Sequence, residues 1–161
     1  MLFRSWHKNG VLNASMPNPY YDNATATTDG LVGYWPFNND TLDYALGNDG
    51  TQNGGVNCGT GVAGKIGTAC SFGGNQTQIT APNSQSLNIT GSAITLSAWV
   101  YPRENNTYDS IIYKGSYGLK IGADRRAYFE LVNSNISSIW ADTGRLGTNT
   151  YVFSLATYNG F

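Results

Sequence analysis

The sequence predicts an all-β fold in which two antiparallel sheets pack as a sandwich or jelly roll. Asn, Gly, Thr and Ser are abundant, Lys and Glu are scarce, and 11 residues are Tyr. This balance is typical of strands and turns rather than helices. Residues 92–102 (SAITLSAWVYP) alternate with an unbroken period of two, and no segment shows helical periodicity beyond about two turns. Many short strands at close spacing favour a sandwich.

Residues 94–101 are predicted to form a strand with two different faces, ended by Pro102. An aliphatic face suits a buried core. A hydroxyl and aromatic face suits either a second packed layer or a surface on which a flat ligand lies. The aliphatic face holds Ile94, Leu96, Ala98 and Val100, and the other face holds Thr95, Ser97, Trp99 and Tyr101.

Length and charge limit the class of protein. A chain of 161 residues suits one domain with a core. Lys and Arg number 9 against 10 Asp and Glu, and only 12% of residues are charged, so no basic field exists for nucleic acid or anionic lipid. No run approaches 18 apolar residues, and residues 1–10 lack the apolar core of a signal peptide.

The segments before the long strand are mostly loops. Residues 1–29 are polar, contain Pro17 and Pro19, and predict a linker or arm that precedes a domain over 30–161. Residues 31–37 (LVGYWPF) predict the first strand, and Pro36 favours a sheet edge or a bulge over a central position. A loop dense in Asn, Asp and Gly follows over 38–55.

Short strands fill the rest of the chain. Two are predicted at 65–72 and 77–81, separated by a Gly-Gly-Asn turn. After Pro102, turns with Gly, Asn or Asp separate most of the predicted strands, which lie at 110–114, 117–121, 127–132, 136–140 and 151–158.

Two cysteines and many glycosylation motifs point to the outside of the cell. Cys58 and Cys70 lie on either side of a Gly-rich turn. They form either a disulfide, stabilising by roughly 3 kcal/mol in the chain-entropy treatment, or two buried free thiols. N-x-[ST] motifs favour an extracellular glycoprotein; they begin at Asn13, Asn23, Asn39, Asn75, Asn88, Asn105 and Asn135.

Six pieces of sequence occur in the order and approximate spacing of a known family. They read GLVGYWPFNND, GNDGT, VAGKIGTACSFGGN, SLNITGSAITLSAWVYP, IIYKGSYGLKIG and LATYNG. Together they resemble the laminin-G-like jelly roll of the concanavalin A-like lectin/glucanase superfamily, from Gly30 to Gly160. The resemblance implies a curved sandwich of two antiparallel sheets, with the strand 94–101 well inside one sheet.

The resemblance also implies strands that this sequence does not contain. Family members continue after the equivalent of ATYNG with a YVNG-like motif and a closing stretch of the type IDEVRIYNRAL, whereas the sequence stops at Phe161. The strand 31–37 would then lack a neighbour. We expect either a fragment of a longer protein or a subunit whose missing strand is supplied by another chain, with residues 1–29 as the donor.

Catalysis is not expected. Residues 59–65 (GTGVAGK) begin like a P-loop, but Ile66 stands where Ser or Thr should bind magnesium, and a strand rather than a helix is predicted to follow. His7 is the only histidine and lies in the arm, which excludes a Ser/His/Asp triad in the sandwich. The only glutamates, Glu104 and Glu130, lack the E-x-D-x-E-like spacing of the superfamily's glycosidases.

The sequence predicts a calcium site rather than a catalytic one. Carboxylate and amide side chains crowd one Gly-containing loop, and calcium accepts such oxygens together. Many members of the resembled superfamily hold a structural calcium near the equivalent loop. The alternative is a solvated turn. The candidate ligands are Asp40, Asp43, Asn48 and Asp49.

The resemblance implies binding rather than catalysis, on a sheet or rim that contacts a glycan or a surface protein. Each aromatic candidate has an alternative role in the core. We carry two hypotheses: a non-catalytic extracellular adhesion or carbohydrate-binding module of a larger surface protein, and a structural subunit that self-associates by strand exchange. The candidate ligand contacts are Trp99, Tyr101, Tyr113, Tyr117 and Trp140, with Asn133 and Asn135 as polar partners.

Overall fold

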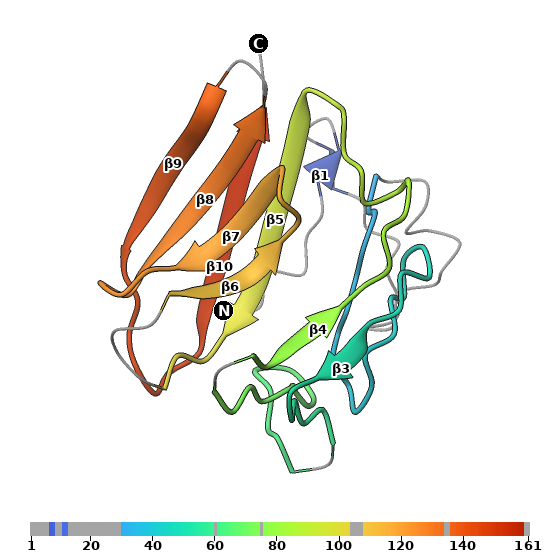
Figure 1. The fold of residues 1–161 in the computed structure, drawn as a ribbon, viewed down its shortest axis with the longest axis vertical. Coiled ribbons are helices and arrows are strands. Elements are labelled where there is room, and N and C mark those ends of the chain that lie inside the picture. Colours follow the sequence, from blue (N-terminus) through green and yellow to red (C-terminus); the bar gives the residue numbers. More distant parts are fainter. Residues whose placement is uncertain are drawn as a thin grey trace. The chain divides into compact units, whose positions relative to one another are not determined.

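The computed structural model describes residues 30–59, 61–74, 76–103, 108–133 and 136–159, together with two short strands before residue 30. The chain forms two compact units, residues 1–88 and residues 89–161. All regular elements of the described residues are strands, as Figure 1 shows. Within these ranges, no helix is long and apolar enough to cross a bilayer.

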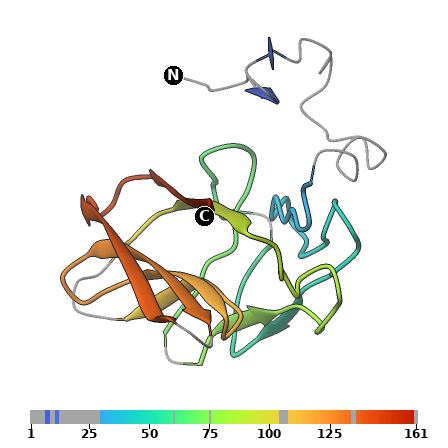
Figure 2. The same ribbon diagram turned by 90° about the horizontal axis from the view of Figure 1, so that it is seen from above.

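The unit 89–161 contains two antiparallel sheets. Strand β5 (Ala93–Val100) pairs with β10 (Val152–Asn159) along its full length. The other sheet is a four-stranded meander, and Figures 1 and 2 show its strands in orange tones. Its order is β6 (Asp109–Tyr113), β7 (Tyr117–Ile121), β8 (Arg126–Asn133) and β9 (Ile136–Arg145).

One apolar core joins the two sheets of this unit. Ile94 and Leu96 of β5 cluster with Leu119 of β7, which is only 1% exposed. Tyr117 and Phe129 complete the buried cluster. Each such side chain stabilises the fold by about 1.5–3 kcal/mol through burial. The predicted all-β sandwich of antiparallel sheets is therefore confirmed, and the buried face of β5 is the predicted aliphatic one.

The unit 1–88 has little regular structure. Strand β3 (Thr51–Asn53) pairs antiparallel with β4 (Gln78–Thr80). Near the N-terminus, β1 (His7–Lys8) pairs with β2 (Val11–Leu12). Most of the remaining described residues are loops, which are held by specific hydrogen bonds rather than by sheet ladders.

Two predicted strands are wrong. Residues 31–37 form no ladder: the Tyr34 N–H donates to Asp43 Oδ1 at 2.8 Å, and Pro36 has no N–H to donate. Residues 65–72 make only isolated bridges, with Ser71 opposite Asn57 and Thr68 opposite Ala63. Sequence reasoning also missed β3, which lies inside the predicted loop 38–55.

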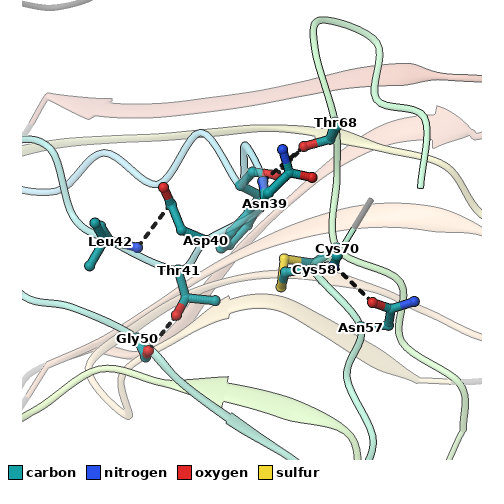
Figure 3. The surroundings of a disulfide bond; sticks show 11 residues. Asn39, Asp40, Thr41, Leu42, Gly50, Asn57, Cys58, Thr68 and Cys70 are labelled. Atoms are coloured by element: carbon teal, nitrogen blue, oxygen red, sulfur yellow. Dashed lines mark hydrogen bonds between the residues drawn. A yellow bond between two sulfur atoms is a disulfide. The ribbon is translucent and has the colours of Figure 1, made fainter. Parts of the chain in front are cut away.

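Cys58 and Cys70 form a disulfide in the unit 1–88, shown in Figure 3. Cys58 is 2% exposed, so the bridge lies in the interior of this unit. Beside it, the N–H groups of Asn57 and Ser71 each donate to the other's carbonyl. The enclosed Gly-rich segment turns back with the Gly64 N–H bonded to the Gly67 carbonyl. Of the two alternatives for these cysteines, the disulfide is therefore the one that the structure contains.

We expect removal of this bridge to lower the free energy of unfolding by roughly 3 kcal/mol. Without the bridge, the unfolded chain regains the conformational entropy of a short closed loop. The variant is Cys58→Ser combined with Cys70→Ser, measured by urea unfolding. Wild-type protein in dithiothreitol should lose the same stability, and the double variant should not respond to the reductant. Equal stability of all four samples would contradict a stabilising role.

Candidate functional site

The structure separates the predicted ligand contacts. Trp99 and Tyr101 lie on the outer face of the β5–β10 sheet, whereas Tyr113 lies on the outer face of the β6–β9 sheet. The core lies between these two faces. They therefore form two separate surfaces rather than one site.

Tyr117 belongs to neither surface. Its side chain is 5% exposed and packs in the core, and burial raises the pKa of its hydroxyl. Tyr117 alternates inward with Leu119 along β7, so a ligand on the sheet surface does not reach it. This part of the predicted set is corrected.

Three further candidates lie where side chains are not described. Asn133 ends β8, and the backbone of Trp140 in β9 pairs with Glu130. Asn135 lies outside the described residues. Their contacts with a ligand stay predictions.

Tyrosine rings lie over glycines on the outer face of the β6–β9 sheet. Tyr113 is opposite Gly118 in the β6–β7 ladder, and a Cβ at Gly118 would lie 3.3 Å from the Tyr113 ring. A Cβ at Gly122 would lie 2.5 Å from the Tyr128 ring. Glycine at these two positions therefore lets each ring rest on the sheet. Tyr113 nevertheless remains 60% exposed.

Lys120 lies beside these rings. Its Nζ forms an ion pair with Glu130 and lies 4.6 Å from the centroid of the Tyr113 ring. Lys120 and Glu130 point to the same side because both alternate with buried residues of β7 and β8. The ammonium group is thus held between a carboxylate and an aromatic ring.

A second acid–base pair lies at the β7–β8 turn. The Tyr128 hydroxyl donates to Asp124 Oδ2 at 2.6 Å, and Arg126 Nε lies 3.5 Å from the same oxygen. The Tyr128 hydrogen bond, followed by the Arg126 backbone N–H and charge, lowers the pKa of Asp124. Two acids and two bases thus neutralise one another around the tyrosines. These residues offer rings, donors and acceptors, and the charges of the two pairs sum to zero.

The outer face of the β5–β10 sheet has a different chemistry. Trp99 and Phe153 are register partners with ring centroids 5.1 Å apart, and the Tyr101 and Tyr151 rings are 4.9 Å apart. Leu155 continues the face and is 52% exposed. This surface is dominated by large apolar side chains.

Hydrogen bonds organise the predicted calcium loop. Asp43, which is 6% exposed, accepts from the N–H groups of Tyr34 and Ala45 through Oδ1, and from Asn48 through Oδ2. Asp49 Oδ1 accepts from the Asp43 N–H. The Asp40 carboxylate accepts from the Leu42 N–H and the Tyr44 hydroxyl.

These bonds occupy carboxylate lone pairs that a cation would need. Across the described ranges, no three His, Cys, Asp or Glu side chains are grouped to hold a metal ion. The calcium site over Asp40, Asp43, Asn48 and Asp49 therefore stays a prediction without geometric support. A higher melting temperature when calcium replaces EDTA would establish the site, and an unchanged melting temperature would exclude it.

Sequence reasoning missed part of both surfaces. Lys120 and Tyr128 were not singled out, although period-two alternation of their strands places them opposite to the core. Phe153 and Tyr151 were missed as neighbours of Trp99 and Tyr101. Their proximity depends on the β5–β10 register, which the sequence does not state.

Residues 72–161 match the family model of laminin G domains in the concanavalin A-like lectin/glucanases superfamily. The match spans 90 of the 161 residues and includes every strand from β4 to β10. The chain therefore belongs to this family. The pieces of the resemblance that precede residue 72 lie outside the match. Comparisons with curated proteins and with solved structures gave no match.

Asp43 makes stability depend on pH. Burial raises the pKa of its carboxyl group, but the hydrogen bonds from Tyr34, Ala45 and Asn48 outweigh burial, so the pKa in the folded protein lies below its ordinary value. The stabilisation is present above the unfolded pKa of about 4 and is lost as pH falls through the folded pKa.

We expect Asp43→Asn to lower the free energy of unfolding by about 2 kcal/mol at pH 7, because an amide NH₂ then faces N–H donors. The variant's stability should also fall less steeply than the wild type's below about pH 4. Urea unfolding between pH 2.5 and 7 measures both effects. Asp49→Asn is the matched control, because an amide oxygen still accepts the bond from the Asp43 N–H. Parallel pH curves for wild type and Asp43→Asn would contradict this role.

Proposed function

We propose that this domain is a non-catalytic, extracellular binding module whose ligand is a neutral glycan. Laminin G-like domains are generally binding modules, although the superfamily also includes glycosidases. A disulfide and the N-x-[ST] motifs are compatible with an extracellular location. A larger surface protein is the expected context.

The observation that carries the glycan proposal is the outer face of the β6–β9 sheet. Its Tyr113 ring is 60% exposed, lies on Gly118, and has the Lys120 ammonium over it at 4.6 Å from the ring centroid. An exposed, immobilised ring is suited to stacking against the C–H face of a sugar. The Lys120 ammonium would donate to sugar hydroxyls, whereas Glu130 Oε2 is buried and holds that ammonium in place.

Charge balance selects the class of glycan. The charges of Lys120 and Glu130 cancel in one ion pair beside Tyr113, and those of Arg126 and Asp124 cancel in another beside Tyr128. An acidic polysaccharide would meet as much repulsion as attraction there. An uncharged hexose is the better fit. An open sheet face covers little of a ligand, so we expect a Kd near 1 mM for a single sugar and a need for multivalent display.

Assembly by strand exchange is the second hypothesis. Within the described ranges, β5 and β10 each pair with one neighbour, so each keeps one unpaired edge there. Such edges accept an added strand. Residues 1–29, the expected donor, lie largely outside the described residues, so the donor stays a prediction.

The test is a glycan array probed with the full chain displayed multivalently. We expect binding to neutral hexose polymers, with at least a tenfold loss in Tyr113→Ala, which removes the stacking ring. Tyr113→Phe should retain most of the binding because the ring remains. Trp99→Ala, on the opposite face, is the matched control and should bind like the wild type.

Three outcomes would contradict the proposal. Absence of binding to every neutral glycan would remove the ligand class. Loss of binding in Trp99→Ala but not in Tyr113→Ala would move the site to the other sheet. Release of reducing sugar from a bound polymer would show an enzyme.

A further inference from the structure

The outer face of the β5–β10 sheet carries no charged residue. In β5 the exposed positions alternate with buried ones, and β10 follows the same pattern in register. The face consists of Ala93, Thr95, Ser97, Trp99, Tyr101, Tyr151, Phe153, Leu155, Thr157 and Asn159. It therefore differs from the β6–β9 outer face, where paired charges surround the tyrosines.

The apolar part of this face is large for such a small unit. Trp99, Tyr101, Phe153 and Leu155 are between 40% and 52% exposed. With side chains that expose roughly 200 Å² when free, these four present about 400 Å² of contiguous surface. The largest apolar patch on a typical monomer is of about this size and is often functional.

Ring geometry favours a protein over a sugar at this face. The Trp99 and Phe153 ring planes are inclined by 46°, and those of Tyr101 and Tyr151 by 61°. The two rings of each pair therefore contact each other at an angle and do not form a flat platform. The hydroxyls of Thr95 and Thr157 are 3.1 Å apart and bond to each other. This face has no acidic or basic side chain that could form hydrogen bonds with sugar hydroxyls.

We propose that this face packs against the same face of a second copy of the chain, forming a weak two-fold dimer. In a two-fold interface the same patch is used on both copies, so a patch with an excess of one charge would face that same charge on its partner. A face without charges avoids that repulsion completely. The inner side of this sheet already packs on another sheet, and the outer side is suited to the same layered contact.

The area of this face determines the expected strength of the dimer. Two copies that cover the apolar residues and their hydroxyl-bearing neighbours would bury about 1,000–1,200 Å² in total, at the low end for specific interfaces. We therefore expect a dimer with a Kd near 0.1 mM rather than a permanent complex. Such a dimer would hold two β6–β9 outer faces in one particle.

Sedimentation equilibrium of the full chain, kept oxidised, tests the proposal. The mass should rise from 17.3 kDa toward twice that value as the protein concentration increases through the expected Kd. Leu155→Lys should raise the Kd at least tenfold, because it places like charges in the contact. Tyr113→Lys is the matched control on the opposite face and should dimerise like the wild type. A thermal melt checks that each variant is folded.

A charge-complementation experiment distinguishes loss of dimerisation from loss of folding. Leu155→Lys and Leu155→Asp should each be monomeric, and an equimolar mixture of the two should regain dimers. A wild type that stays monomeric up to 1 mM would overturn the proposal. So would a dimer that Leu155→Lys leaves intact, or one that Tyr113→Lys abolishes. None of these outcomes depends on glycan binding.

Discussion

The contact of Ile94 and Leu96 with Leu119 and Phe129 is the interaction on which the unit 89–161 depends. These side chains come from two sheets that share no hydrogen-bonded strand, so burial of apolar surface is what joins them. Because side chains of a strand alternate, the same contact fixes which residues point outward. Both candidate surfaces follow from that alternation: one on the outside of β5 and β10, and one on the outside of β6 to β9.

The strands that sequence reasoning placed well are those whose pattern is local. The alternation of residues 94–101 predicted β5 and its buried face, and the predicted strand 117–121 coincides with β7. Residues 31–37 are equally apolar and aromatic, yet Tyr34 bonds to the side chain of Asp43 instead of to a strand. A strand needs a partner ladder, and that partner is set by tertiary structure, which a local pattern does not contain.

In the candidate site, too, local patterns predict some features and tertiary structure determines the others. Alternation alone places Trp99 outward, but Tyr117 shows that an aromatic residue at the start of a strand can equally belong to the core. The neighbours that give each surface its chemistry come from other strands. Phe153 is 54 residues from Trp99 in sequence, and only the β5–β10 register brings the two together. For this reason the sequence predicted one binding site where the structure has two surfaces.

The self-neutralised charges on the β6–β9 outer face have a kinetic consequence. Lys120 with Glu130, and Arg126 with Asp124, cancel at close range, so these four residues add little to the electric field in solvent. A ligand approaching it is neither steered nor repelled, and its association rate is set by diffusion and orientation alone. Capture by this surface would then be nearly independent of ionic strength, and would work equally in fresh water, in seawater or in a salty extracellular matrix.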